Sequence, residues 1–463
     1  MNALDLARWQ FGITTVYHFL FVPLTIGLAF LVAGLQTAWV RSGNERYLRL
    51  TRFYGELFLI NFALGVVTGI VQEFQFGMNW SAYSRFVGDI FGAPLAIEGL
   101  LAFFLESTFL GLWIFGWDRL PRLVHLATIW IAAIGTLLSA LFILAANSWM
   151  QDPVGYRVNA TAGRAELTDF LAVLTSPVVV TAFLHTIMAA FLTAGAFVAG
   201  VALWRVWRND RDADTFRSAA VAGAWVVLIS AVLVLATGDQ QGKVMTTAQP
   251  MKMAAAEALY QTEKPASFSI LTIGTLDGRT QLFSIRIPNL LSWLATGSLD
   301  GTVEGINDLQ SQYQATYGPG DYVPYVPVTY WSFRLMVGMA ALAAAAAAWI
   351  LWTLRRRELP VGRRVVWVAM LLPFVPLAAN ILGWILTEMG RQPWLVFGVM
   401  QTQAGVSPGT SALEVLITLV GFTVLYGALA VIEVGLLLRR IRAGLPEVAA
   451  SGAAPERPAA FSY

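Results

Sequence analysis

The sequence predicts an all-α integral membrane protein of about nine transmembrane helices, because its charge content is low, its apolar stretches are long and its arginines alternate between connections. Of the 463 residues, 57% are hydrophobic and 13% are charged, whereas a soluble protein carries about 25% charged residues. One charged side chain at the centre of a bilayer costs about 2.5 to 3.5 kcal/mol, which explains the deficit. The net charge of +2 predicts no nucleic-acid partner. The absence of cysteine excludes disulfides, thiolate haem ligands and cysteine-ligated iron–sulfur clusters.

Nine stretches are long enough to cross a bilayer, which takes about 20 apolar residues. They are residues 12–40, 54–77, 94–117, 123–149, 179–204, 218–237, 329–354, 365–388 and 411–438. A polar stretch between the sixth and seventh contains no spanning segment, so we expect a large extramembrane loop there. The expected organisation is six helices within residues 1–237, the loop at 238–328, three helices within 329–440, and a disordered cytoplasmic tail at 441–463.

The basic residues give the expected orientation, because cytoplasmic connections carry an excess of Lys and Arg. One set of connections carries Arg41, Arg46, Arg49, Arg52, Arg119, Arg122, Arg205, Arg208, Arg211, Arg217, Arg355, Arg356, Arg357, Arg363, Arg364, Arg439, Arg440 and Arg442. The opposite short connections carry only Arg85, Arg157, Arg164 and Arg391. We therefore expect the N-terminus and the large loop outside and the C-terminus in the cytoplasm. The alternation holds at every crossing, which supports nine spans.

Ionisable side chains within the spans are functional candidates, because they are costly to keep in lipid. A rise of 1.5 Å per residue gives them all a predicted position in the outer half of the membrane. They are His18, Glu73, Glu98, Glu106, His185 and Glu388. This one-sided distribution indicates a cofactor layer near the outer surface. Glu414 and Glu433 in the last span are assigned instead to interfacial or partner-helix contacts.

The three histidines narrow the kind of cofactor. His18 and His185 lie within apolar helices on different spans, and imidazole is a common axial ligand of haem. A zinc or copper site would need several close donors, such as histidines at i and i+4, and the sequence has no such pair. Isolated histidines favour haem, although each could instead hydrogen-bond a neighbouring helix. His125, at the inner start of the fourth span, is interpreted as an interfacial residue.

Several strings resemble cytochrome bd oxidase subunit I and occur in the same order. They are RWQF at 8–11, YHFLFVPLT at 17–25, EFQFGMNW at 73–80, VGDIFGAPLAIEGLLAFFLESTFLGLWIFGW at 87–117, NSWMQDPVG at 147–155, WSFRLMVG at 331–338 and GRQPW at 390–394. The resemblance covers about residues 1–440, and its strings are long, so it is highly specific.

The resemblance implies two haem b groups and one haem d. His185 and Met336 would ligate a low-spin haem b, which takes electrons from quinol. Arg334, two residues before Met336, matches a position near that haem.

The other two haems, a high-spin haem b and the haem d that binds oxygen, would take His18 and Glu388 as ligands. Glu98 is assigned to the same haem pair, and Arg391 and Trp394 of the GRQPW string match positions that help to bind it. Which of His18, Glu98 and Glu388 serves which iron stays open.

The resemblance also implies sites for protons and quinol. Glu106 and Ser139 match a proposed proton path from the cytoplasm. The loop resembles the short form of the family's quinol-binding loop, and within QPMKMAAAEALYQT (249–262) Lys252 and Glu257 match positions implicated in quinol oxidation. A base is required near the quinol, because quinol loses two protons with its two electrons.

The implied protein is the haem-bearing subunit of a bacterial cell-membrane quinol:oxygen oxidoreductase. It would oxidise quinol on the outer side and reduce O2 to water with cytoplasmic protons, contributing to the proton motive force. Cytochrome bd subunit II would be its obligate partner, with or without small single-helix subunits. The alternatives are a cyanide-insensitive relative with only b-type haems and a proton-coupled transporter, although transporters often have internal repeats and none is found. Ubiquinol and menaquinol both stay open as the substrate.

Overall fold

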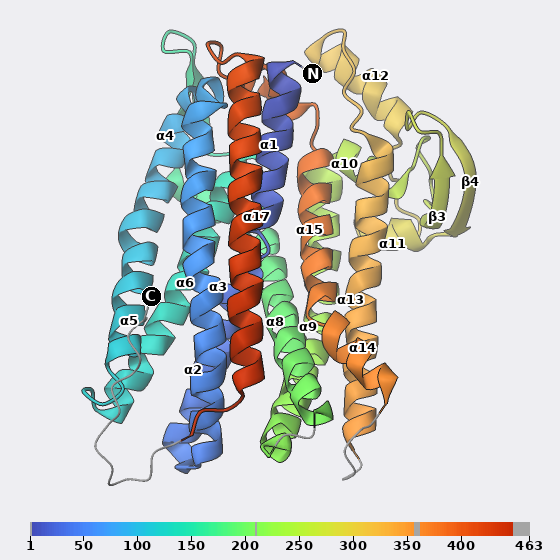
Figure 1. The fold of residues 1–463 in the computed structure, drawn as a ribbon. Coiled ribbons are helices and arrows are strands. Elements are labelled where there is room, and N and C mark those ends of the chain that lie inside the picture. The colour runs from blue at the N-terminus through green and yellow to red at the C-terminus, as the bar shows by residue number, and fades with distance from the viewer. Residues whose placement is uncertain (1, 209–210, 356–361, 448–463) are drawn as a thin grey trace.

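The computed structural model describes residues 2–208, 211–355 and 362–447, and the chain there is a bundle of long helices (Figure 1). Within these ranges, nine helical segments are long and apolar enough to cross a membrane, which confirms the predicted number. They are Ala3–Ser42, Glu45–Met78, Ser81–Phe115, Arg122–Gln151, Phe170–Trp207, Ala213–Ala248, Val326–Leu354, Arg363–Met389 and Ala412–Ala443. Arg356, Arg357 and most of the expected tail, residues 448–463, lie outside the described residues.

Helices account for most of the described chain. The first half contains α1 (Ala3–His18), α2 (Val22–Ser42), α3 (Glu45–Met78), α4 (Ser81–Ile97), the π-helix η1 (Glu98–Phe103), α5 (Phe104–Phe115), α6 (Arg122–Gln151), α7 (Phe170–Leu174), α8 (Pro177–Trp207) and α9 (Ala213–Ala248). The second half contains α10 (Pro250–Glu257), α11 (Leu290–Thr296), α12 (Ile306–Tyr317), α13 (Val326–Leu354), α14 (Arg363–Leu371), α15 (Phe374–Met389), α16 (Thr402–Gly405) and α17 (Ala412–Ala443).

Three two-stranded antiparallel sheets lie outside the bundle core. They are β1 (Tyr156–Asn159) with β2 (Arg164–Leu167), β3 (Phe268–Gly274) with β4 (Gln281–Ile287), and β5 (Trp394–Val396) with β6 (Met400–Gln401).

Two spans are interrupted where prolines disturb the helix. The first span breaks after His18 and resumes at Val22, just before Pro23, because a proline restricts the residue before it and has no N–H to donate. The third span contains Pro94, and a π-helical turn begins four residues later at Glu98. π-Helical turns occur often at functional sites. Both interruptions lie beside a predicted site residue, the first beside His18 and the second at Glu98.

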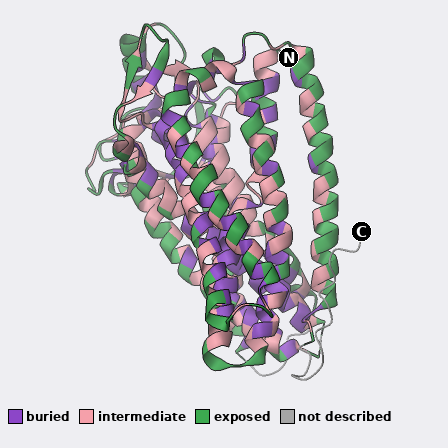
Figure 2. Cartoon of the chain, turned by 90° about the vertical axis from the view of Figure 1, so that its left-hand side faces the viewer, coloured by how far each residue is buried: buried purple, intermediate pink, exposed green. Residues whose placement is uncertain are grey.

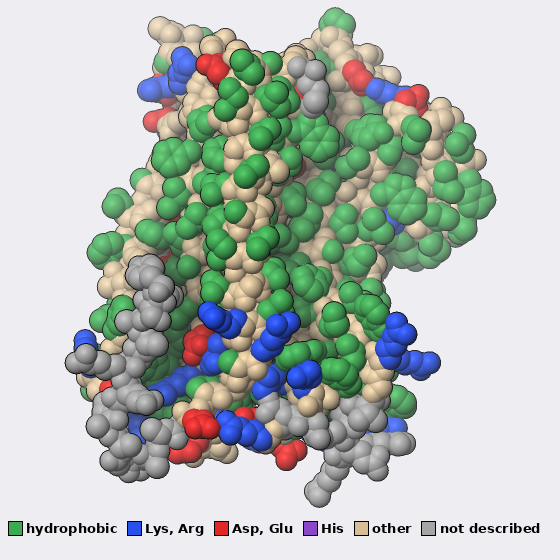
Figure 3. Space-filling view, viewed as in Figure 1, with side chains coloured by type: hydrophobic (Ala, Val, Ile, Leu, Met, Phe, Trp, Pro, Cys, Tyr) green, Lys and Arg blue, Asp and Glu red, His purple; other side chains and the backbone are tan. Residues whose placement is uncertain are grey.

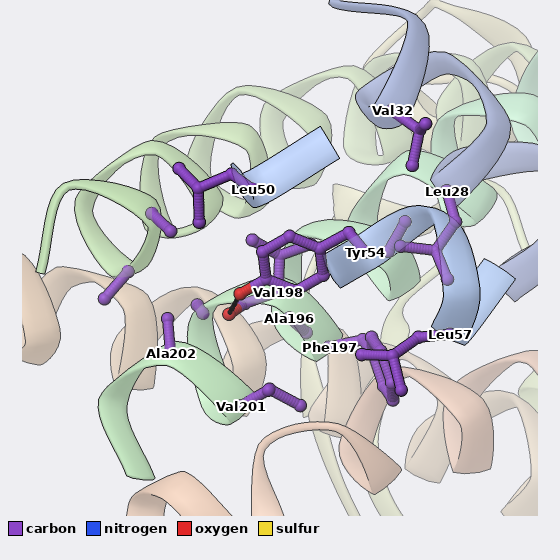
Figure 4. Close-up of a cluster of buried hydrophobic side chains, with 14 of the residues drawn as sticks. Leu28, Val32, Leu50, Tyr54, Leu57, Ala196, Phe197, Val198, Val201 and Ala202 are labelled. Atoms are coloured by element: carbon purple, nitrogen blue, oxygen red, sulfur yellow. Dashed lines mark hydrogen bonds between the residues drawn. The ribbon is translucent and has the colours of Figure 1, made fainter. Parts of the chain in front are cut away.

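The core fills the middle of the bundle, where α2, α3, α8 and α9 pack (Figure 2). Figure 4 shows Tyr54 of α3 among aliphatic side chains, with its hydroxyl donating to the Val198 carbonyl at 3.1 Å. Glycines allow these helices to approach closely. A Cβ at Gly27 of α2, for example, would clash with the Ala190 carbonyl oxygen of α8.

The connection between α9 and α13 is a folded region. α9 continues to Ala248 rather than ending near residue 237 as predicted, and α10, the β3–β4 hairpin, α11 and α12 follow it. Figure 1 shows the hairpin beside α13 rather than over the end of the bundle. Figure 3 shows Lys and Arg gathered at the end of the bundle opposite the N-terminus, and the predicted orientation depends on that distribution.

Candidate functional site

Helix α6 contacts two predicted acidic residues near its middle. Ser139 Oγ donates to Glu98 Oε1 at 2.8 Å, which joins α6 to η1. One turn earlier on α6, a Cβ at Gly135 would lie 2.8 Å from Glu106 Cγ, so glycine leaves the space that the buried Glu106 side chain occupies. Ser139 therefore bonds Glu98, and Glu106 packs one turn farther from the loop end of α6.

The last two turns of α6 contact two further predicted residues. Asn147 Nδ2 donates to Glu388 Oε1 at 2.9 Å, which joins α6 to α15. At the end of α6, Gln151 Oε1 accepts a hydrogen bond from Lys252 Nζ of α10. The same helix thus holds a carboxylate of the bundle and an amine of the outer loop.

These four α6 positions, 135, 139, 147 and 151, are separated by four or eight residues and form a row that we call the α6 row. Because 3.6 residues make one turn, a row of this spacing winds slowly around its helix. It faces η1 and α5 at one end and α15 and α10 at the other. Its ends are 16 residues apart, about 24 Å at 1.5 Å per residue, against a hydrocarbon thickness of about 30 Å.

Glu388 is held from two sides at the end of α15. Arg391 donates to Glu388 Oε2 through Nε at 3.0 Å and Nη2 at 2.5 Å, and a third nitrogen, Nη1, bonds the Leu395 carbonyl. Lys252 packs close by, because a Cβ at Gly390 would lie 2.6 Å from Lys252 Cγ. Burial lowers the pKa of Lys252 to about 7, with Glu388 opposing and Arg391 adding to the shift.

Trp394 packs the connection between α9 and α13 against this end of the bundle. Its ring stacks on Tyr322 with centroids 5.5 Å apart and meets Tyr317 edge-on at 4.9 Å. A cavity of about 10 Å³, lined in part by Lys252, Tyr322 and Trp394, has room for one water molecule. Trp394 Nε1 is buried and has no hydrogen-bond partner among the described residues.

Glu257, five residues after Lys252, belongs to a different cluster. Arg334 Nη2 of α13 lies 2.6 Å from Glu257 Oε2, and the two side chains are 11% and 2% exposed. The Ser269 backbone N–H also donates to Glu257, at 3.2 Å. Burial raises the pKa of Glu257, and the Arg334 charge opposes that rise. The two predicted quinol-site residues are therefore divided between two clusters.

Arg334 has two buried nitrogens, Nε and Nη1, with no hydrogen-bond partner among the described residues. Its guanidinium lies 4.7 to 4.9 Å from the ring centroids of Phe268, Tyr330 and Phe333. A buried cation with unused donors suits an anionic group such as a haem propionate. Met336, half a turn farther along α13, lies against α15, because a Cβ at Gly383 would lie 2.9 Å from its Sδ.

His18 is held by a threonine of α3. His18 Nδ1 lies 2.9 Å from Thr68 Oγ1, and that hydroxyl lies 2.9 Å from the Leu64 carbonyl, four residues back on its helix. A hydroxyl has one hydrogen to donate. We assign that hydrogen to Leu64, so Nδ1 carries the imidazole proton and Nε2 presents a lone pair. Gly69, the next residue, leaves room for the ring, since a Cβ there would lie 3.2 Å from His18 Cε1.

His185 repeats this arrangement on a different pair of helices. His185 Nδ1 lies 3.2 Å from Thr237 Oγ1 of α9, and that hydroxyl lies 2.8 Å from the Leu233 carbonyl. A Cβ at Gly238 would again lie 3.2 Å from the imidazole Cε1. With this assignment both histidines would present Nε2 to a metal, and a bond from the other nitrogen is how metal-ligating histidines are usually oriented.

His125 differs in having both ring nitrogens bonded. Gln36 Nε2 lies 2.9 Å from Nδ1, and Nε2 lies 2.8 Å from the Trp113 carbonyl. The residue is 2% exposed, so it is a buried structural residue near the start of α6. This contrast separates His125 from His18 and His185.

Thr68, Thr237, Asn147 and Gln151 were not among the site residues predicted from the sequence. One weak signal was available, because Thr-Gly occurs at 68–69, 237–238 and 296–297, and the first two pairs lie 50 and 52 residues after the two histidines. Taken together, two imidazoles with free Nε2, a thioether and a partly unpaired arginine fit axial ligation and propionate binding of haem.

A family model described as cytochrome bd terminal oxidase subunit I matches residues 6–445. The chain is 46% identical over 447 residues to a Bacillus subtilis (strain 168) protein named cytochrome bd ubiquinol oxidase subunit 1, with 96% of this chain and 94% of the relative covered. It is 37% identical over 502 residues to the Escherichia coli (strain K12) cytochrome bd-II ubiquinol oxidase subunit 1, covering 96% and 97%. A solved bd oxidase structure from Geobacillus thermodenitrificans matches with a TM-score of 0.85 and 28% identity, covering 96% of this chain and 99% of that one.

Proposed function

The chain belongs to the cytochrome bd terminal oxidase subunit I family, and from this premise we propose that it is the haem-bearing subunit that couples quinol oxidation to reduction of O2. Family membership makes it a subunit of a terminal quinol oxidase and a multi-pass protein of a bacterial membrane. The proposed overall reaction converts two quinols and one O2 into two quinones and two water molecules.

The observation that carries the proposal is the matched state of His18 and His185. Each imidazole has Nδ1 bonded to a threonine whose own hydrogen is directed to a backbone carbonyl. Each therefore offers a lone pair at Nε2, as an axial ligand must. Two histidines that only joined helices would not need the same hydrogen-bond arrangement. His125, by contrast, has both ring nitrogens bonded.

We assign His185 and Met336 as the two ligands of a low-spin haem b. They belong to α8 and α13, which contact one another. Arg334 would direct its unpaired Nε and Nη1 towards a propionate, and its Nη2 keeps the bond to Glu257. When bound, haem supplies the electron transfer and the oxygen chemistry, while the protein supplies binding and orientation.

We assign His18 and Glu388 to the irons of a high-spin haem b and a haem d, with Glu98 in the same region. Arg391 would compensate the Glu388 charge and hold its carboxylate through the hydrogen bonds from Nε and Nη2. Trp394 would act indirectly, by packing the outer tyrosines over this end of α15.

Quinol oxidation requires groups that accept protons at the outer loop. Glu257 and Lys252 are the proposed acceptors, since burial raises the pKa of Glu257 and brings that of Lys252 to about 7. Both values move towards neutral pH, where a side chain can take up and release a proton efficiently. In the predicted orientation the protons leave on the outer side.

Protons for water would enter from the cytoplasm through Glu106. It packs on Gly135, and the next group towards the loop is the Ser139–Glu98 pair. The Ser139 hydroxyl can accept and donate in turn, so it can pass a proton to the Glu98 carboxylate. Proton uptake inside and release outside would contribute to the proton motive force without a separate pump.

A reduced-minus-oxidised optical spectrum of the purified complex, with pyridine haemochrome analysis, tests the proposal. We expect haem b bands together with the red-shifted band of a chlorin. A spectrum with haem b bands alone would mean that a second high-spin b-type haem takes the place assigned to haem d. No haem at all would overturn the proposal and favour the proton-coupled transporter.

The proposed complex contains cytochrome bd subunit II, with or without small single-helix subunits. Affinity purification through this chain should retain a second large membrane protein in constant ratio. Oxygen consumption with ubiquinol and with menaquinol, measured on the same preparation, identifies the quinol.

A further inference from the structure

The β3–β4 hairpin turns its polar side chains towards the protein. Ser269 and Thr272 are 0% and 2% exposed, and the Tyr330 hydroxyl of α13 lies 2.8 Å from Ser269 Oγ. Ser284 Oγ lies 2.9 Å from Thr272 Oγ1. Arg286 points the same way and donates to the Ala258 carbonyl at 2.7 Å.

The opposite face of the hairpin is apolar and exposed. Its residues are Ile270, Ile273, Phe283, Ile285 and Ile287, which are 51%, 47%, 52%, 46% and 40% exposed. Figure 3 shows hydrophobic side chains over this face. An antiparallel sheet beside water normally has the reverse pattern, apolar inwards and polar outwards. None of these five residues is ionisable, and Arg286 of β4 is turned inwards. The other arginine of the hairpin, Arg279, lies in its turn and pairs with Asp321.

The hairpin lies beside the membrane-spanning helices. Its turn packs against the start of α13, because a Cβ at Gly278 would lie 2.8 Å from Pro327 Cδ. At its other end, α11 contacts α9, with Lys243 Nζ 5.8 Å from the ring centroid of Trp293. Lys243 precedes the end of α9 by five residues, about 7.5 Å along the helix. The apolar face therefore continues the outward surface of the spans.

We propose that the β3–β4 hairpin rests with its apolar face in the outer leaflet, at the boundary between lipid headgroups and acyl chains. The depth follows from the backbone. A two-stranded sheet has unpaired N–H and C=O groups along both edges, which hydrocarbon cannot satisfy. Water and headgroups at the boundary satisfy them, while the isoleucines and Phe283 reach the upper acyl chains. Exposed Trp293, at 47%, suits the same boundary, where tryptophan is enriched.

Site-specific fluorescence in the whole complex tests this, because the chain has no cysteine of its own. Ile273→Cys and Phe283→Cys are each labelled with an environment-sensitive fluorophore. The complex is placed in nanodiscs of phosphatidylethanolamine and phosphatidylglycerol, with or without phosphatidylcholine spin-labelled high on its acyl chain. We expect the spin-labelled lipid to quench both labels and aqueous iodide to have little effect. The unsubstituted complex is treated with the same fluorophore, and any label it takes up measures the background from other subunits.

Ser311→Cys on α12 is the matched control, because Ser311 is exposed on the same folded region and we expect iodide rather than lipid to quench it. Strong iodide quenching at positions 273 and 283 would overturn the proposal in favour of a water-facing hairpin. Protection from both quenchers would also overturn it, since a protein partner would then cover the face. Elution as a single species confirms that each variant is folded, independently of haem content.

Discussion

Arg334 and Glu257 form a buried ion pair between α13 and α10, with Nη2 2.6 Å from Oε2. The pair joins the outer region to the bundle. Breaking a buried pair by removing one partner costs about 3 to 5 kcal/mol, so Arg334→Gln should lower the thermal unfolding midpoint of the purified complex markedly. Arg334→Lys should recover only part of that loss, because an ammonium lacks the planar fork.

Asp321→Asn is the control for this experiment. Asp321 pairs with Arg279 in the same region, but the two side chains are 58% and 49% exposed, and exposed pairs contribute little. Equal destabilisation by the two substitutions would contradict the role of the buried pair.

Lys252 should give the quinol reaction a rising pH dependence. Burial lowers its pKa from 10.5 to about 7, so the amine is mostly protonated below that pH and mostly neutral above it. Only the neutral amine accepts a proton, and oxygen consumption with quinol should therefore rise through about pH 7. Lys252→Met should lack this limb and Lys264→Met should keep it. An unchanged profile in Lys252→Met would assign the limb to another group.

The lowered pKa of Lys252 also predicts that the stability of the complex depends on pH. Because the folded pKa lies below the free value of 10.5, the unfolded chain binds the proton more tightly. The stability of the complex should fall as the pH drops from about 10 to 7, relative to Lys252→Met. Chemical unfolding at a series of pH values measures the difference, which should be constant if Lys252 titrates normally.

Thr237 should affect how firmly His185 holds the proposed low-spin haem b. Loss of an outer partner of a metal ligand typically costs 10- to 100-fold in affinity, so Thr237→Val should weaken binding of that haem by about this factor. Thr237→Ser keeps the hydroxyl and should retain it. Haem transfer to apomyoglobin measures the release rate. Equal rates in the valine and serine variants would mean that the hydroxyl has no part in holding His185.

Glu106→Gln should slow oxygen consumption and leave every haem band unchanged, because a neutral amide cannot relay a proton. Glu433→Gln is the matched control. Glu433 is also an acidic residue within a span, on α17, but it is not among the residues described as contacting the α6 row. Gly135→Ala should also slow turnover, since its new Cβ would displace the Glu106 side chain. Normal turnover in Glu106→Gln would remove this residue from the proton route.

The spans could be predicted because hydropathy depends on composition alone. The end of α9 could not, because residues 238–248 are polar, and a helix outside lipid needs no apolar signal. Glu414 was assigned to an interfacial contact, and the structure gives it a local role, as part of the capping box that begins α17. Thr68 and Thr237 could not be predicted either, because neither residue is unusual in a membrane helix. Their role appears only when the fold brings each one into contact with its histidine.

The α6 row also limits how this segment can change in length. Ser139 and Asn147 belong to one continuous helix, so their contacts with Glu98 and Glu388 share a single register. One residue inserted between them would turn the following part of α6 by about 100° and move it by about 1.5 Å. Asn147 and Gln151 would then both leave their partners. We expect substitutions to accumulate between positions 139 and 147 in related proteins, but insertions and deletions to be excluded.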